Sequence, residues 1–436
     1  MKLSTSQLAV YQGESQLLSP VSIELNASQP LTILGATGAG KSLLLQAIMG
    51  SLPNSLTVTG EVRVNGKVVS YHQRRHLWGK MLALLPQEPW KSLDPLMRVY
   101  KQIAEVFRYT QGLDEYQSIK RSLAALDEMG LAGHEMKRPE ELSGGMAQRV
   151  AMLCTVAAGA PILMVDEPTK GLDVAFRQEV IETLKHHAGK GVLLTITHDI
   201  EVAQQLAGNV IVMKEGMVVE RGTAQEVLTC PKHDYTQSLI NAQPKQWPLE
   251  AHSPHGAHIL SAHQLVVGRL GRAITKPLSF SVQRGEIVGV FGASGAGKST
   301  LGDTLLGLIP TISGQVDVLE EVSWHHRWLK VYQDPPASFE PSVKLGTLLD
   351  ELLHIHSLTK DALRSAMSEL DLSVRLLERR VSELSGGELQ RFSIIRAMLL
   401  RPSFIFADEP VSRLDPITGR AVVHKLVDFA KQSQCG

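Results

Sequence analysis

The sequence predicts two α/β domains in tandem, and three observations lead to this prediction. The chain has 436 residues, which is too long for one ordinary domain and long enough for two that each bury a sizeable core. Hydrophobic residues make up 43% and charged residues 20% of the chain, as in ordinary globular proteins. Three motifs occur twice in the same order, so the second half of the chain repeats the first.

The repeated motifs define the predicted domain boundaries. GATGAGKS at 35–42 recurs as GASGAGKS at 292–299, ELSGGMAQR at 141–149 as ELSGGELQR at 383–391, and ILMVDEP at 162–168 as FIFADEP at 404–410. We predict a first domain at residues 1–246, a linker at 247–258 and a second domain at 259–436. The linker histidines His252, His255 and His258 are a weak candidate for a metal site, because no predicted element holds them in place.

Short apolar runs precede the motifs of the first copy. LTILG, MLALLPQ, ILMVDE and GVLLTITHD have the length and composition of buried parallel strands, which carry ligand groups at their carboxyl ends. Residues 96–140 are polar and helix-like, which predicts a helical subdomain inserted into an α/β core. We therefore expect each domain to combine a mixed sheet with inserted helices.

The glycine-rich segments match the phosphate-loop pattern GxxxxGK[ST]. Glycines let the backbone N–H groups and the helix N-terminus face phosphates, the lysine meets the β and γ phosphates, and the serine meets Mg²⁺. The predicted ATP-binding residues are Gly35, Gly38, Gly40, Lys41 and Ser42 in the first copy and Gly292, Gly295, Gly297, Lys298, Ser299 and Thr300 in the second. A chance glycine turn is a poor alternative, because both matches lie in the same sequence context.

An aspartate and a glutamate end one apolar strand of each copy, as Asp166 and Glu167 and as Asp408 and Glu409. These strands bring the carboxylates to the edge of the sheet that carries the phosphate loop. Mg²⁺ binds few carboxylates together with phosphate oxygens, which suits the aspartates, and each glutamate is a candidate base for the attacking water. The alternative is that the carboxylates only cap the next turn.

Composition excludes several other classes of protein. Forty-four Lys and Arg balance forty-four Asp and Glu, so no general basic field exists to attract nucleic acid. The cysteines Cys154, Cys230 and Cys435 lie far apart, which argues against a disulfide framework and suits a reducing cytosol. We find no signal peptide and no run of about eighteen apolar residues. We therefore expect any transport role to be exerted on partner subunits.

The segments LSGGMAQR and LSGGELQR resemble the signature of the ABC ATPase family, although a lone SGG also suits an ordinary helix N-cap. In that family the signature of one domain closes over the nucleotide of the other domain. The resemblance implies that Ser385, Gly386 and Gly387 contact ATP on the first phosphate loop, and that Ser143, Gly144 and Gly145 contact ATP on the second. Pairing of the two domains within one chain would then form both ATP sites.

The resemblance also assigns roles to residues outside these motifs. Gln87 and Gln333 match the glutamine loop that touches Mg²⁺ and senses the membrane partner, although either alone could be an ordinary surface residue. His198 matches the switch histidine that contacts the γ-phosphate, and Tyr11 is a candidate for stacking on adenine. The implied catalytic residues are Glu167, His198 and Glu409, and the implied metal ligands are Ser42, Gln87, Asp166, Ser299, Gln333 and Asp408.

The second copy departs from the family pattern. Its switch histidine is expected near position 440, whereas the sequence given ends at Gly436. His424 does not replace it, because it follows Asp408 by only 16 residues and lies in a helix-like stretch, and Gly268 stands where the first copy has Tyr11. We therefore expect a second domain truncated at its C-terminal end, with an exposed strand and unequal ATP sites.

Two further segments resemble one branch of the family. PQEPWKSLDP, YQDPPASFEP and PKHDYTQSLI are similar to segments of the oligopeptide, dipeptide and nickel importer ATPases. The implied partners are two membrane permeases and an extracytoplasmic substrate-binding protein, and the implied location is peripheral, on the cytoplasmic face of the inner membrane. The implied cargo is a peptide, nickel or a metal chelate. Two alternatives stay open: an accessory ATPase of phosphonate breakdown and a tandem ABC translation factor.

Overall fold

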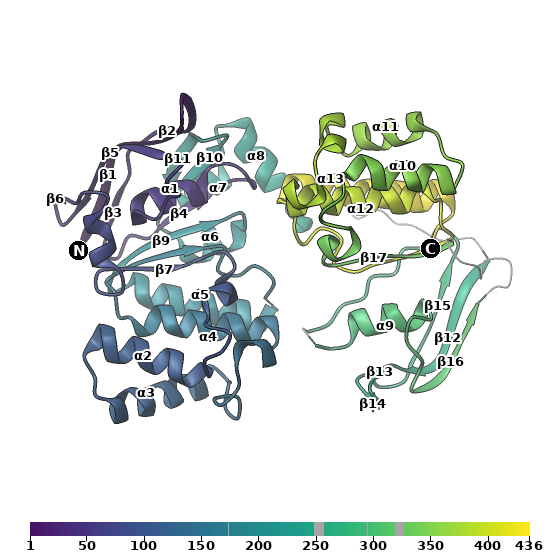
Figure 1. Ribbon diagram of the computed structural model, residues 1–436, viewed down its shortest axis with the longest axis horizontal. Coiled ribbons are helices and arrows are strands. Elements are labelled where there is room, and N and C mark those ends of the chain that lie inside the picture. Colours follow the sequence, from purple (N-terminus) through teal and green to yellow (C-terminus); the bar gives the residue numbers. More distant parts are fainter. Residues whose placement is uncertain (173, 248–256, 294, 319–326) are drawn as a thin grey trace. The chain divides into compact units, whose positions relative to one another are not determined.

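The computed structural model describes all residues except 173, 248–256, 294 and 319–326, and the chain divides into two units, Met1–Asn241 and Ala242–Gly436 (Figure 1). Among the described residues no helix is long and apolar enough to cross a membrane. The histidine cluster predicted in the linker lies largely outside the described ranges, because His252 and His255 are not among them. Elsewhere in the described ranges no three His, Cys, Asp or Glu side chains gather in a way that could hold a metal ion.

A six-stranded sheet forms the centre of the first unit, in the order β11-β10-β4-β9-β8-β7. Its strands are β4 (Leu31–Leu34), β7 (Leu82–Leu85), β8 (Ile162–Asp166), β9 (Val192–Thr197), β10 (Asn209–Lys214) and β11 (Met217–Thr223). All pairs are parallel except that of β10 with β11. Every residue of β4, β8 and β9 is buried, which confirms the prediction of buried parallel strands from the apolar runs.

An antiparallel sheet packs beside this core through α1 (Lys41–Met49). Its strands are β1 (Lys2–Gln12), β2 (Ser15–Val21), β3 (Glu24–Asn26), β5 (Thr57–Val64) and β6 (Lys67–Val68). Apolar residues of both sheets and of α1 form one cluster, so α1 is fixed on both sides and the loop that precedes it is held in place.

The remaining helices of the first unit include the predicted helical subdomain, α2 (Val99–Gln111) and α3 (Glu115–Glu128), which lie side by side (Figure 1). A second apolar cluster joins them to α4 and to one face of the central sheet. The other helices are α4 (Gly144–Ala157), α5 (Val174–Ala188), α6 (Ile200–Leu206), α7 (Ala224–Thr229) and α8 (Asp234–Asn241).

The second unit repeats parts of this arrangement. Its antiparallel sheet has the order β15-β12-β16, and a parallel pair joins β17 to β18. The strands are β12 (His258–Val266), β13 (Gly268–Arg269), β14 (Arg272–Ala273), β15 (Leu278–Gln283), β16 (Ser313–Val318), β17 (Trp328–Val331) and β18 (Phe404–Ala407). The helices are α9 (Lys298–Leu305), α10 (Leu345–Ile355), α11 (Lys360–Glu369), α12 (Gly386–Leu399) and α13 (Pro416–Ser433).

The two units differ most in the segment before the phosphate loop. In the first unit this segment is β4, which lies between β10 and β9. In the second unit residues 288–291 form no strand, and Ile287 and Phe291 are 52% and 94% exposed. No strand pairs with residues 288–291 among the described residues of this unit, so the apolar segment is solvated.

Candidate nucleotide-binding site

The first glycine-rich segment forms a loop between β4 and α1, as predicted. Gly40 is the residue before α1 and has a φ of 88°, a left-handed conformation that favours glycine. A Cβ on Gly35 would lie 2.4 Å from the carbonyl oxygen of Met213 on β10, so the loop requires a glycine there too. The loop thus opens α1 with its N–H groups free of a side-chain cap.

Lys41 is buried and its ammonium turns back onto this loop. Its Nζ donates hydrogen bonds to the carbonyl oxygens of Gly35 at 2.7 Å and Ala36 at 2.9 Å. Lys298 makes the same bonds in the second unit, to Gly292 at 2.9 Å and Ala293 at 3.0 Å. Both loops therefore hold a cation over the place where a helix N-terminus favours an anion.

Ser42 and Asp166 meet at the edge of the sheet, although 124 residues separate them in the sequence. Ser42 follows β4 on α1, Asp166 ends β8, and the Ser42 hydroxyl donates to Oδ2 of Asp166 at 2.6 Å. Burial raises the pKa of Asp166, the bond from Ser42 lowers it, and the net shift is upward. A hydroxyl and a carboxylate in contact beside a phosphate loop are the donors that Mg²⁺ takes from such a protein, so these residues fit the metal.

Glu167 lies beside Asp166 in a strained backbone conformation, with a φ of 51°. Its carboxylate accepts from the Thr197 hydroxyl at 3.1 Å, and Nδ1 of His198 lies 2.8 Å from Oε1. Burial raises the pKa of Glu167, but the hydrogen bond and charge of His198, the charge of Lys41 and the Thr197 bond outweigh it and the net pKa is lowered. The carboxylate is thus held ionised, as a base requires.

Gln87, Tyr11 and Ser143 form no hydrogen bond or ion pair with this cluster in the part of the first unit that the structure describes. Gln87 is exposed just after β7, next to the strand that carries Asp166. The Tyr11 hydroxyl accepts a hydrogen bond from Gln16 at 3.0 Å. Ser143 is the N-cap of α4 and accepts from the N–H of Met146 at 3.3 Å, and Ser385 caps α12 in the same way through Glu388. Both signature serines thus serve as helix caps, and their contact with ATP stays a prediction.

The second unit assembles its carboxylates differently. Glu409 has the same strained conformation as Glu167, with a φ of 45°, but its Oε2 accepts from Nε2 of Gln333 at 2.7 Å. Asp408 is buried and faces the ammonium of Lys330, 3.6 Å away. His424, on α13, packs against the ring of Trp247, so it is not part of this site. Asp408 therefore fits a metal ion less well than Asp166, because a cation already lies beside it.

Sequence reasoning missed one residue of the first site, Tyr235. Its hydroxyl accepts a hydrogen bond from the N–H of Ala36, in the phosphate loop, at 2.8 Å. The Lys214 ammonium lies 5.5 Å from the centre of the ring, and Nδ1 of His233 accepts from the N–H of Tyr235. Tyr235 belongs to the segment PKHDYTQSLI, which marked a family branch in the sequence but gave no signal of contact with the loop.

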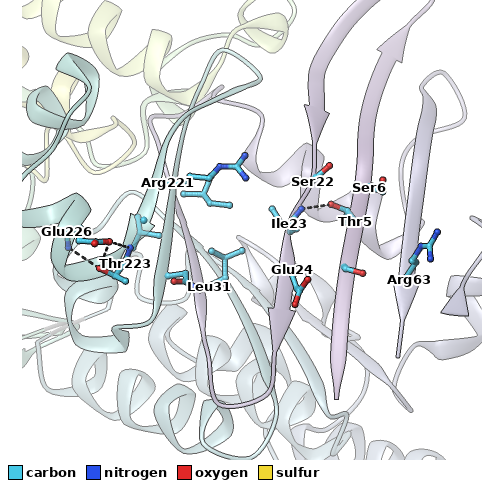
Figure 2. A pocket seen from close by; sticks show the side chains of 15 residues that line it. Thr5, Ser6, Ser22, Ile23, Glu24, Leu31, Arg63, Arg221, Thr223 and Glu226 are labelled. Atoms are coloured by element: carbon cyan, nitrogen blue, oxygen red, sulfur yellow. Dashed lines mark hydrogen bonds between the residues drawn. The ribbon is translucent and has the colours of Figure 1, made fainter. Parts of the chain in front are cut away.

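A separate pocket of about 710 Å³ lies between the antiparallel sheet and the end of the β10–β11 hairpin (Figure 2). Its lining includes Thr5, Glu24 and Arg221, together with Leu31 at the amino end of β4. The phosphate loop follows the carboxyl end of β4, so this pocket is at the opposite end of the strand from the candidate site.

Phosphate loops, paired carboxylates and signature helices define a nucleotide-hydrolysing protein, and comparison with known proteins identifies its family. The family model for the ABC transporter matches residues 18–170 and 275–412. The chain belongs to the ABC transporter ATP-binding proteins, and it is an ATPase.

The relatives cover nearly the whole chain. An uncharacterized ABC transporter ATP-binding protein YejF of Escherichia coli K12 is 31% identical over 96% of this chain and 86% of its own length. The peptidoglycan transport ATP-binding protein YejF of Agrobacterium fabrum is 32% identical over 97% of this chain and 84% of its own length. The glutathione import ATP-binding protein GsiA of Salmonella typhi is 31% identical over 94% of this chain and 77% of its own length. A solved dimeric ATP-binding cassette with ADP and Pi is 24% identical, covers 51% of this chain and 98% of its own, and has a TM-score of 0.46.

Proposed function

We propose that this protein is the ATPase subunit of an importer for peptides or peptide-like compounds. The observation that carries the proposal is the first site, where Lys41, the Ser42–Asp166 pair and the Glu167–His198 pair gather at one edge of the sheet. Two relatives are named for peptidoglycan transport and glutathione import, which supports a peptide-type cargo over nickel.

In this proposal Ser42 and Asp166 would hold Mg²⁺, and Gln87, which follows β7, would be a further ligand. The metal would neutralise negative charge on the phosphates. Lys41 would bind the β and γ phosphates, and His198 would hold the Glu167 carboxylate in place. Glu167 then accepts a proton from the water that attacks the γ-phosphate. The signature helices α12 and α4 would each close over the nucleotide of the other domain, so that ATP is sandwiched between Ser385 or Ser143 and a phosphate loop.

A groove on the first unit suits a permease partner. It has a volume of about 650 Å³ and lies between the helical subdomain and the core, lined by residues of β7, α2, α4 and the turn after Gln87. Its lining is mainly apolar and includes Leu93, Met97 and Tyr109. We propose that a cytoplasmic segment of the permease lies in this groove, because it adjoins the glutamine loop and a large apolar patch marks an interaction site. The protein would then be peripheral to the membrane.

The experiment that tests this proposal combines hydrolysis with capture of the partner. The purified chain is expected to hydrolyse ATP in the presence of Mg²⁺, and the tagged chain is expected to bring down a membrane permease from a detergent extract. Hydrolysis together with recovery only on ribosomes or in a soluble enzyme complex would contradict the importer proposal. It would favour the translation-factor or phosphonate alternative.

A further inference from the structure

A buried lysine lies beside the carboxylate that the second copy offers to Mg²⁺. Lys330, on β17, has a side chain that is 8% exposed. Its Nζ is 2.6 Å from Oδ1 of Asp303 on α9 and 3.6 Å from Oδ2 of Asp408. The ring of Tyr332 adds a third partner, with its centre 5.1 Å from Nζ. The ammonium is thus surrounded by groups that stabilise positive charge.

The two equivalent positions of the first copy carry no charged residue. Lys330 stands three residues before Gln333, and the residue three before Gln87 is Leu84. Asp303 stands five residues after Lys298, and the residue five after Lys41 is Gln46. The lysine and its nearest carboxylate are therefore both particular to the second copy, while the loop lysines and the aspartate–glutamate pairs are common to both.

The carboxylates around Lys330 stabilise its buried charge. A buried ammonium is costly to desolvate unless carboxylates compensate its charge. Asp303 is held in place by a second cation, since its Oδ2 accepts from Arg269 at 3.0 Å. Lys330 is thus anchored to Asp303 with its charge directed at Asp408, and it repels a divalent cation that approaches the same carboxylate.

Glu409, the residue after Asp408, also contacts a side chain of the same unit. Gln333, the residue that the family pattern directs to Mg²⁺, donates its side-chain amide to Glu409. In the first copy the corresponding glutamate contacts His198 instead, and Asp166 contacts Ser42. The aspartate and the glutamate of the second copy therefore each contact a different type of side chain from their counterparts in the first copy.

We propose that Lys330 acts as a built-in counter-cation for Asp408, so that the second phosphate loop binds ATP with little dependence on Mg²⁺. This inference rests on the proposed function, because it requires that the second loop bind nucleotide. Lys298 still holds the phosphates, but the metal site that Ser42 and Asp166 offer in the first copy is weakened. The second site then serves to bind nucleotide in the absence of efficient hydrolysis, since Mg²⁺ is needed to neutralise charge on the transferred phosphoryl group.

The test measures nucleotide binding one loop at a time. In a Lys41→Ala background, a fluorescent ATP analogue reports the second loop in excess Mg²⁺ and in EDTA. With Lys330 present, we expect the affinities for the analogue in Mg²⁺ and in EDTA to lie within about threefold of each other. With Lys330→Met, we expect the analogue to bind at least about tenfold more tightly in Mg²⁺ than in EDTA, because a positive charge near a metal ligand is removed. Binding of Mn²⁺ to the analogue complex, followed by electron paramagnetic resonance, should rise in parallel.

Two controls protect the interpretation. Leu84→Met, in a Lys298→Ala background, places the same side chain at the equivalent position of the first copy and should leave its Mg²⁺ dependence unchanged. Lys330→Leu gives a second uncharged variant if the methionine protein fails to fold, as judged by its thermal unfolding.

The possible outcomes are distinct. Mg²⁺ dependence that is the same with Lys330 and with either uncharged variant would overturn the inference and leave the proposed function intact. An equal change in Leu84→Met would also overturn it, because charge would not be the cause. If the second loop binds no nucleotide under either condition, the proposed function fails at that loop and the role of Lys330 fails with it.

Discussion

Glu167 and Glu409 have the same unusual backbone conformation, with φ values of 51° and 45°. A left-handed conformation is unfavourable for glutamate and persists when the surrounding structure requires it. In the first unit the Glu167 N–H is fixed by the carbonyl oxygen of Ile196 at 2.8 Å, so the turn after β8 is tied to β9. This turn brings the Glu167 carboxylate to His198, whose Nδ1 lies 2.8 Å from Oε1.

Substitution of the base tests its role. Glu167→Gln keeps the shape and the Thr197 contact but removes the proton acceptor, so ATP should bind normally while hydrolysis falls by a factor on the order of 10² or more. Steady-state hydrolysis and retention of radiolabelled ATP measure the two effects. Lys41→Ala is the matched control, because it should abolish nucleotide binding at this loop. Full hydrolysis by Glu167→Gln would show that the base is misassigned or that the second site performs the chemistry.

Cysteine reactivity offers a test of local burial. Burial raises the pKa of the Cys154 thiol to about 12, and burial likewise raises the pKa of Cys435 to about 12. At pH 8 little of either thiol is then ionised to the reactive thiolate, whereas Cys230 is exposed. Iodoacetamide should therefore alkylate Cys230 in the folded protein and all three cysteines in denaturant, as mass spectrometry can show. Rapid alkylation of Cys154 without denaturant would contradict the packing of α4.

At the scale of elements, α8 contributes to the phosphate loop through Tyr235. Removal of the hydroxyl in Tyr235→Phe leaves the ring and its contact with Lys214, and it leaves the Ala36 N–H without its partner. A neutral hydrogen bond contributes about 1 kcal/mol, so nucleotide affinity at the first loop should fall about fivefold. Titration with an ATP analogue in a Lys298→Ala background measures this change. Unaltered affinity would mean that the loop keeps its shape without α8.

The groove beside the glutamine loop can be tested with two exposed tyrosines. Tyr109, on α2, lines the groove and is 72% exposed, and Tyr116, on α3, is 75% exposed and lies outside it. An unpaired carboxylate in an apolar interface costs on the order of 2 kcal/mol or more, so Tyr109→Glu should lose most of the co-purifying permease. Tyr116→Glu should retain it, and hydrolysis by both isolated proteins should match that of the unaltered chain. Equal loss with both variants would place the partner elsewhere.

Some elements follow directly from the sequence, and others depend on contacts that no local pattern encodes. The apolar runs predict β4, β8 and β9, and because parallel strands share a carboxyl edge, they also predict the meeting of Ser42 with Asp166. Tyr235 is 199 residues from Ala36 and lies on a short helix, so its contact depends on the whole path of the chain. The exposure of residues 288–291 could not be read from their apolar composition either, because burial of such a segment requires strands on both sides.

On the scale of the whole molecule, the repeat conserves motifs and changes the contacts around them. Both loops place a lysine over their own carbonyl oxygens, and both signature segments begin a helix with a serine cap. The carboxylates differ, since Asp166 contacts a hydroxyl where Asp408 faces an ammonium. Sequence identity of the motifs thus predicts two nucleotide sites, whereas their chemical inequality depends on residues outside the motifs.

The same contrast predicts unequal hydrolysis by the two sites. Glu167 is oriented by His198 next to a metal-binding pair, whereas Glu409 is engaged by Gln333 next to Lys330. Glu409 must give up its hydrogen bond from Gln333 before it can accept a proton from water, and the Lys330 ammonium opposes Mg²⁺ at Asp408, so most turnover should come from the first site. Glu167→Gln should therefore remove nearly all ATP hydrolysis, while Glu409→Gln should leave most of it.

Measurement of each variant at saturating ATP, with binding to both loops verified separately, makes the comparison quantitative. The double variant Glu167→Gln with Glu409→Gln sets the background, and Glu167→Gln alone should lie close to it. Equal loss in the two single variants would contradict the inequality, because it would mean that both glutamates act as bases despite their different partners. If each substitution halved the rate of ATP hydrolysis, the inequality would likewise be contradicted, because two independent and equivalent sites would each supply half of the turnover.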